Sequence, residues 1–165
     1  MAWVFRYVQN MRRKIKGEAL FLCDLSLEEE ENAVSYLCRH VQRQQYEDEL
    51  EDLKKQHSVS QSSQLLSLNP FVGQDGLIRA SGRIQNAAFL NLEARQPIIL
   101  PKNHRFTRLL VEFYHRKFLH INTATAMSEI RQKYWVPSLR QLLNSIQSHC
   151  SACKLRRAKP RQPQM

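Results

Sequence analysis

Four residues of metal-binding types lie close together in the C-terminal part of this sequence. His115 and His120 have four residues between them, and Cys150 and Cys153 form a C-x-x-C pair further along the chain. Zinc takes four nitrogen or sulfur ligands in a tetrahedron, and a short C-x-x-C turn can bring two thiolates to one ion. The pattern therefore predicts one structural Zn²⁺ per chain. Four protein ligands leave no open position for water, so catalytic zinc is not expected.

Two alternatives stay open from spacing alone. His104 and His149 are close enough in sequence to replace one of the histidines as a ligand. The C-x-x-C pair could instead be a thiol–disulfide oxidoreductase motif, but that chemistry is typical of a βαβ context, which this stretch lacks.

The predicted ligands must be positioned by helix ends. Histidines five positions apart do not share a helical face, so we expect His115 near the end of one helix and His120 in the following turn. Asn103 can cap that first helix. Its apolar side would comprise Phe106, Leu109, Leu110, Phe113 and Tyr114.

Two more helices are expected after the histidines. One begins at Asn122 or Thr123 and runs to about Tyr134; the other is capped by Ser138, with Leu142, Leu143 and Ile146 inside. A module of this size has a small core, and a bound metal would supply the missing stability.

The N-terminal part also reads as helical. A helix is predicted from Ala2 to about Lys16, with Trp3, Phe5, Val8 and Met11 on its apolar side and Gly17 as its stop. Ser26 and Glu29 form a capping box for a second helix. That helix carries Val34, Leu37, Cys38 and Val41 on one face and continues toward Lys55 after a break near Gln45. Cys38 is read as a core residue.

A short β-element is predicted between these helical regions. After a polar loop at 57–64, Leu77-Ile78 and Arg83-Ile84 read as two strands, and residues 96–101 as a third. Asp75-Gly76 is a turn signal.

The charge is divided unevenly along the chain. Residues 101–165 contain 13 Lys+Arg and two acidic residues, a balance of +11, whereas residues 1–100 contain 12 Lys+Arg and 13 Asp+Glu, a balance of −1. A basic module favours an anionic partner such as nucleic acid. The alternative is a solvated basic surface.

No stretch approaches the roughly 18 apolar residues that span a bilayer. The start of the chain is apolar first and basic second, the reverse of a secretory signal. We therefore expect an intracellular protein with no membrane partner, whose four cysteines are thiols or metal ligands.

The H-x4-H…C-x-x-C pattern resembles the HHCC zinc-binding N-terminal domain of retroviral and retrotransposon integrases, most closely the BEL/Pao type. The stretches that carry the resemblance are "LNPFVGQDGLIRASGRI", "PIILPKNH", "YHRKFLH", "IRQKYWVPS" and "CSACKLRRAKPRQP". The preceding segment looks like the connector between the RNase H and integrase parts of such polyproteins.

The resemblance implies a mostly α fold: a zinc-stapled, helix-turn-helix-like three-helix bundle, preceded by a helical connector with a short β-element. The implied boundaries are 1–97 for the connector, 98–157 for the zinc-binding domain and 158–165 for a linker-like tail. The implied zinc ligands are His115, His120, Cys150 and Cys153.

The family's domain contacts DNA and helps integrase multimerise, so the resemblance implies DNA, a second copy or an integrase catalytic core as partners, and a nuclear location. Tyr134 and Trp135 could stack on bases, although their spacing is more typical of a core. The candidate DNA contacts are Arg131, Lys133, Arg140, Lys154, Arg156, Arg157, Lys159 and Arg161.

Catalysis is not expected from this chain. Family integrases use a separate core with two aspartates and a glutamate, and this sequence has no Asp or Glu after Glu129. The expected function is a nucleic-acid-binding or assembly module of DNA integration. The alternative is a zinc-stabilised protein-interaction scaffold with no role on DNA.

Overall fold

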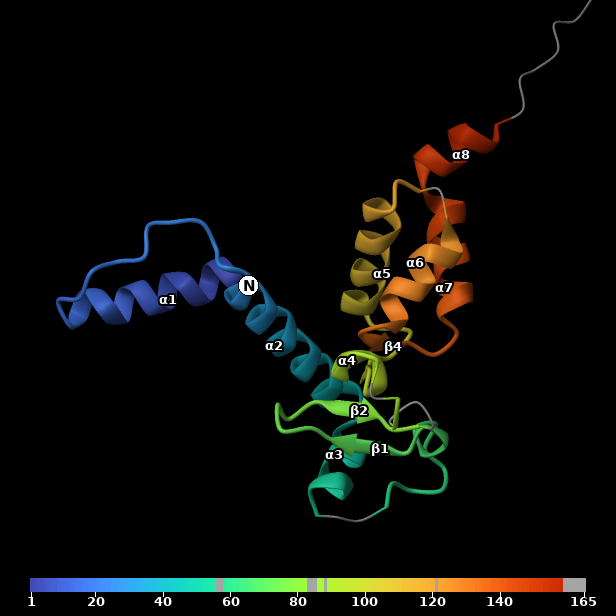
Figure 1. Cartoon of the computed structure of the whole chain (residues 1–165), viewed down its shortest axis with the longest axis horizontal. Coiled ribbons are helices and arrows are strands. Elements are labelled where there is room, and N and C mark those ends of the chain that lie inside the picture. The colour runs from blue at the N-terminus through green and yellow to red at the C-terminus, as the bar shows by residue number, and fades with distance from the viewer. Residues whose placement is uncertain (56–57, 83–85, 88, 121, 159–165) are drawn as a thin grey trace, which may run out of the picture.

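A computed structural model describes residues 1–55, 58–82, 86–87, 89–120 and 122–158. The fold is mostly helical with one small sheet, as predicted (Figure 1). Among the described residues, no helix is both long and apolar enough to cross a membrane.

The N-terminal helix α1 (Ala2–Ile15) projects away from the rest of the molecule and contacts α2 (Figure 1). Its extent agrees with the prediction, and it ends before Gly17, whose φ of +71° suits glycine. The expected apolar side is correct for Phe5, whose ring packs against Tyr36 of α2, and wrong for Trp3, Val8 and Met11, which are exposed. The buried residue is Arg6, because its guanidinium forms an ion pair with Glu29 on α2.

Helix α2 (Leu27–Gln45) begins with the predicted capping box. The Ser26 hydroxyl accepts from the Glu29 backbone N–H, and the Glu29 carboxylate accepts from the Ser26 N–H. The predicted break lies at Tyr46, where α3 (Glu47–Lys54) begins. Cys38 is fully buried in the core, as expected, and burial raises its thiol pKa to about 12.

The sheet has the order β1-β2-β3-β4, formed by Pro70–Val72, Ile78–Ala80, Ile98–Ile99 and Tyr134–Trp135. The first three strands are antiparallel, and β4 lies parallel to β3. The 3₁₀ turn Leu66–Leu68 precedes β1, and the one-turn helix α4 (Leu92–Arg95) precedes β3.

Two predictions about the strands need correction. The hairpin joins β1 to β2 across the Asp75-Gly76 turn, with Val72 opposite Ile78, so its first strand precedes that turn. The predicted strand at Arg83-Ile84 lies outside the described residues. Tyr134 is in β4 and not at a helix end, because its backbone pairs with Ile98.

The C-terminal bundle consists of α5 (Arg105–Lys117), α6 (Thr123–Arg131), α7 (Leu139–His149) and the short α8 (Ser151–Arg157). Asn122 caps α6 as predicted, its side-chain oxygen accepting from the backbone N–H groups of Ala124 and Thr125. Leu143 and Ile146 of α7 are buried, and Leu142 is half-buried.

Three details of the bundle differ from the prediction. His104, not Asn103, caps α5, because its Nδ1 accepts from the Phe106 N–H at 3.1 Å. Ser138 occupies the cap position of α7, but its side chain makes no capping hydrogen bond. Leu109 and Phe113 are exposed, because α5 turns Val111, Thr107 and His115 inward instead.

One core crosses the predicted boundary at 97/98. Cys38, Val41 and Leu77 pack in the same cluster as Val111 and Leu143. The buried amide of Gln42 adds polar ties: it donates to the carbonyls of Ile78 and Ile99 and accepts from the Ile78 N–H. The division into 1–97, 98–157 and 158–165 stays a prediction, and residues 159–165 lie outside the described chain.

Candidate metal centre

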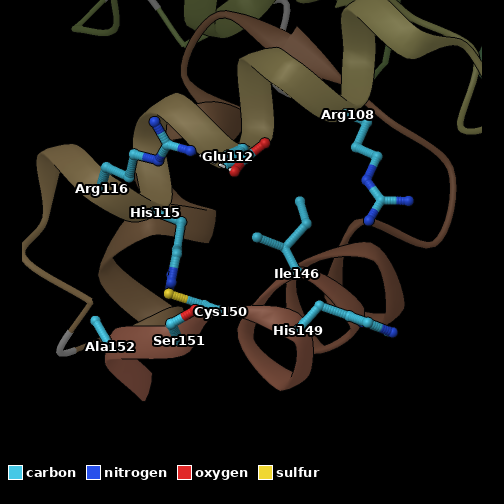
Figure 2. Close-up of a pocket in the computed structure, with 9 residues that line it drawn as sticks. All are labelled: Arg108, Glu112, His115, Arg116, Ile146, His149, Cys150, Ser151 and Ala152. Atoms are coloured by element: carbon cyan, nitrogen blue, oxygen red, sulfur yellow. Dashed lines mark hydrogen bonds and ion pairs between the residues drawn. The ribbon is translucent and has the colours of Figure 1, made fainter. Parts of the chain in front are cut away.

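A depression of about 310 Å³ lies where the end of α5 meets the junction of α7 and α8 (Figure 2). His115 and Cys150 form part of its wall, and Figure 2 shows the imidazole directed toward the thiol. Arg108, Glu112 and His149 stand around the same depression. It gives the side chains behind it a route to solvent.

His115 lies in the last turn of α5 and is buried. The chain then reverses through Leu119 and His120, which adopt left-handed backbone angles, with φ of +53° and +61°. The turn is closed by the hydrogen bond from the His120 N–H to the His115 carbonyl, at 3.1 Å. As predicted, one histidine ends a helix and the other lies in the turn that follows.

Two consecutive left-handed residues without glycine are uncommon, since each costs of order 1 kcal/mol or more and persists only where its surroundings fix it. This turn stacks the two imidazoles edge to face, with ring centroids 4.5 Å apart. Arg156 of α8 supports it by donating to the carbonyls of His120 and Leu119.

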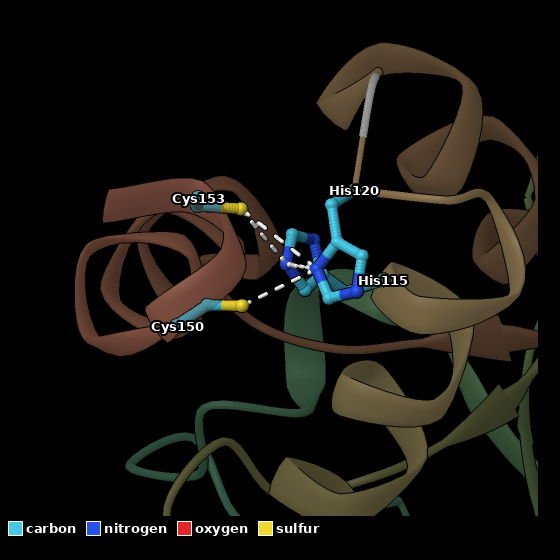
Figure 3. A group of neighbouring side chains, drawn as sticks. All are labelled: His115, His120, Cys150 and Cys153. Atoms are coloured by element: carbon cyan, nitrogen blue, oxygen red, sulfur yellow. Dashed lines mark hydrogen bonds between the residues drawn. The ribbon is translucent and has the colours of Figure 1, made fainter. Parts of the chain in front are cut away.

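Cys150 joins α7 to α8 in an extended conformation, and Cys153 follows in the first turn of α8. The backbone N–H of Cys150 still bonds to the Ile146 carbonyl, while its own carbonyl accepts from Lys154. The C-x-x-C pair therefore straddles a helix–helix junction, which aims both thiols toward the histidines (Figure 3).

The four side chains converge. Their ligand atoms all lie within 4.8 Å of one another. Nε2 of His115 is 2.9 Å from Nδ1 of His120 and 3.4 Å from Sγ of Cys153. Nδ1 of His120 is 3.2 Å from Sγ of Cys150 and 3.8 Å from Sγ of Cys153.

These separations test whether the residues fit a zinc ion. At ordinary Zn–N and Zn–S lengths, a tetrahedron places its ligand atoms about 3.3 to 3.8 Å apart. The observed contacts fall close to that range, and the set of two nitrogens and two sulfurs is a usual one for structural zinc. The separations within the group run from 2.9 Å to at most 4.8 Å, so the donors fit the ion after small adjustments that bring them to tetrahedral spacing.

Local electrostatics favour the ligating form of two of the four groups. Burial, with help from the neighbouring His120, lowers the pKa of His115, so its imidazole stays neutral. The hydrogen bond from the Cys153 N–H holds the pKa of Cys150 below its usual value, which favours thiolate. Burial raises the pKa of Cys153, so a metal must displace the proton of that thiol on binding.

The alternative ligands are held elsewhere. His104 caps α5 and contacts Gln44 with its Nε2 at 3.1 Å. His149 has its Nδ1 2.7 Å from the Ser145 carbonyl oxygen, on its own helix. Within the described ranges, neither belongs to the group of clustered ligands.

Comparison with known protein families also indicates zinc binding. Residues 102–159 match the integrase zinc binding domain. This segment contains all four clustered ligands and covers about a third of the chain. No curated protein and no solved structure matched the chain. The integrase zinc-binding match and the cluster together support Zn²⁺ as the cofactor, and the match concerns this domain and not a catalytic core.

The predicted DNA contacts that fall within the described residues lie at two separate ends of the bundle. Arg131 and Arg140 lie where α6 ends and α7 begins, near β4, whereas α8 is at the far end of α7 (Figure 1). Lys154, Arg156 and Arg157 are exposed on α8. Lys133 forms an ion pair with Glu93, at 3.1 Å. Lys159 and Arg161 lie outside the described residues.

Sequence reasoning missed two features of this region. Leu119 and His120 adopt left-handed backbone angles, which a sequence usually signals by glycine, and neither residue is glycine. The sequence therefore predicted where the turn lies but not its shape. Arg156 was considered only as a surface charge, yet it also bonds to the carbonyls of that turn. Only the spacing between His115 and His120 hinted at such a reversal.

Proposed function

We propose that this chain acts as an integrase-type zinc module, in which one Zn²⁺ is held by His115, His120, Cys150 and Cys153. The convergence of four ligand atoms within 4.8 Å carries the proposal. Such an ion supplies structural stability: it ties the end of α5 to α8, in which Cys153 is the buried side chain.

Metal analysis of variants tests this role. Purified protein should contain one zinc per chain, and Cys153→Ser should lose it together with helicity. Cys23→Ser is the matched control, because Cys23 is an exposed free cysteine outside the cluster and should keep full zinc content. Zinc retained by Cys153→Ser would remove this residue from the ligand set.

We further propose that the basic bundle binds nucleic acid through phosphate contacts. Support comes from the balance of +11 over residues 101–165 and from exposed cations at both ends of the bundle. The proposed contacts are Arg131, Lys133, Arg140, Lys154, Arg156, Arg157, Lys159 and Arg161. Of these, Lys133 would first have to leave Glu93.

The finer assignments belong to the same proposal. The chain would be part of a BEL/Pao-type polyprotein, would act in the nucleus, and would assemble with a second copy or with an integrase catalytic core. DNA cleavage and joining would come from that core, because residues 130–165 supply no carboxylate to hold divalent ions.

One observation favours a second candidate, the protein-interaction scaffold. Helix α1 exposes Trp3, Val4, Tyr7 and Ile15, none of them less than half exposed. Scattered apolar residues are ordinary on a surface, but several on one projecting helix are typical of a protein contact. Binding of duplex DNA that falls steeply with salt would support the nucleic-acid function; a lack of binding at low salt would favour the scaffold.

A further inference from the structure

Trp135 in β4 is a large, partly exposed aromatic side chain that the zinc site does not explain. It is 40% exposed and lines two neighbouring depressions near the sheet. The larger, of about 630 Å³, is bounded by Leu68, Ala80, Arg95, Pro97, Arg131 and Trp135, and we call it the Trp135 groove. The smaller, of about 160 Å³, lies between Trp135 and Arg140.

The position of this indole is fixed by the sheet. Strand β4 alternates, so Tyr134 points into the core at 3% exposure and Trp135 points outward. The Trp135 carbonyl accepts from the Leu100 N–H, and the Lys133 carbonyl accepts from the Ile98 N–H, both at 2.9 Å. An exposed indole on an anchored backbone presents a flat apolar surface at little entropic cost on binding.

The surroundings of the indole are cationic. Arg131 lines both depressions, Arg95 lines the groove and Arg140 lines the smaller depression. Among the described residues that line the two, none is acidic. Within the described ranges, Arg131 and Arg140 make no side-chain ion pair or hydrogen bond, and the buried Nε of Arg95 has no partner. The neighbouring Lys133, by contrast, is paired with Glu93.

We propose that the Trp135 groove binds an unpaired nucleobase, stacked on the indole, with its flanking phosphates on Arg131 and Arg140. This inference rests on the proposed nucleic-acid function and specifies which part of the nucleic acid the groove binds. The chemistry matches: every base has a π-face that stacks on an aromatic ring, and arginine binds phosphate in a bidentate fork. An apolar peptide would fill the groove but leave the arginines without anionic partners.

The test compares ligands with equal backbone charge. A short fluorescent oligothymidylate and an abasic strand of the same length are titrated with the full chain loaded with zinc. Trp135→Ala should weaken binding of oligothymidylate on the order of tenfold, since one stacked base is lost. Its affinity for the abasic strand should not change. Oligouridylate titrated in parallel distinguishes DNA from RNA as the source of the base, by which strand binds more tightly.

Salt dependence separates this inference from the function on which it rests. Trp135→Ala removes no phosphate contact, so the slope of log affinity against log salt should equal that of the wild type. Arg131→Ala should instead flatten the slope. Trp3→Ala is the matched control, because this other tryptophan is exposed on the distant helix α1.

Two further measurements guard against a variant that simply misfolds. Trp135→Phe keeps an aromatic face and should retain most of the affinity for oligothymidylate. The Trp3→Phe variant leaves Trp135 as the one tryptophan of the sequence. Its fluorescence should be quenched by oligothymidylate but not by the abasic strand. Unchanged oligothymidylate affinity in folded Trp135→Ala would overturn the inference and assign the groove to a protein partner. If the wild type binds no strand at low salt, the nucleic-acid function itself fails.

Discussion

Nδ1 of His120 lies 2.9 Å from Nε2 of His115, although five positions separate the two residues on the chain. A regular helix would place them on different faces. The left-handed angles of Leu119 and His120 fold the second imidazole back onto the first, and the thiols of Cys150 and Cys153 approach from the junction of α7 and α8. The geometry of the turn is thus the condition for a four-ligand site.

This turn makes a prediction about backbone strain. Leu119→Gly should raise the free energy of unfolding by up to about 1 kcal/mol, because glycine adopts positive φ without a steric cost and the leucine is 68% exposed. Urea denaturation of the zinc-loaded protein measures it. Leu109→Gly, at an exposed position within α5, should instead destabilise by roughly 1 kcal/mol. If both glycine substitutions destabilise the protein, the side chain of Leu119 makes stabilising contacts despite its exposure.

The second prediction concerns pH and the attachment of α1. The hydrogen bonds from Arg6 lower the pKa of Glu29 from 4.5 to about 2. A depressed carboxyl pKa stabilises the folded state above pH 4.5, and this contribution is lost as pH falls toward 2. Wild-type protein should therefore lose stability across that window by more than Glu29→Gln does.

Glu29→Gln is a suitable comparison because glutamine can still complete the capping box with Ser26. Both proteins keep the same four zinc ligands, none of them Glu29, so the difference between their unfolding midpoints at each pH reports the ion pair. Identical pH dependence in the two proteins would show that Arg6 and Glu29 do not form this pair in solution.

The third prediction concerns the boundary at 97/98. A fragment of residues 98–157 should fold when zinc is present, since structural zinc contributes on the order of 10–16 kcal/mol of apparent folding free energy in small zinc-finger peptides. It should be less stable than the full chain, because it lacks the core contacts of Cys38, Val41 and Leu77. Circular dichroism with and without zinc measures both effects. A fragment that stays unfolded with zinc would make the two segments one folding unit.

The fourth prediction concerns duplex DNA. Each neutralised phosphate adds roughly −0.9 to the slope of log affinity against log salt, so about four contacts give a slope on the order of −3 to −4. Alanine at Lys154, Arg157 and Lys159 should flatten this slope without loss of zinc. Arg156 is left in place because it donates to the carbonyls of His120 and Leu119 in the ligand turn. Fluorescence anisotropy over a salt series measures it, with Trp3→Ala as the control. Equal slopes for the wild type and the alanine variant would place the phosphate contacts elsewhere on the bundle. In a separate assay, neither protein should cleave DNA in the presence of magnesium or manganese.

Much of the architecture could be predicted because its signals are local. The capping box at Ser26 and the cap at Asn122 each join a side chain to backbone N–H groups within three residues. The spacing of the ligands also placed His115 at a helix end and His120 in the next turn.

The errors arose where distant contacts decide the outcome. Tyr134 joined a strand because Ile98 pairs with it, which no periodicity between residues 122 and 134 reveals. Arg6 displaced the apolar residues as the buried side chain of α1 because Glu29 lies opposite it on α2. The shape of the turn at Leu119 likewise depends on α8, through Arg156.

The most direct test of the central claim is X-ray absorption at the zinc edge of the purified, folded chain. Coordination by His115, His120, Cys150 and Cys153 predicts two sulfur ligands at about 2.3 Å and two nitrogen ligands at about 2.0–2.1 Å, with one zinc per chain. A first shell without sulfur, or folded protein that contains no zinc, would contradict the account.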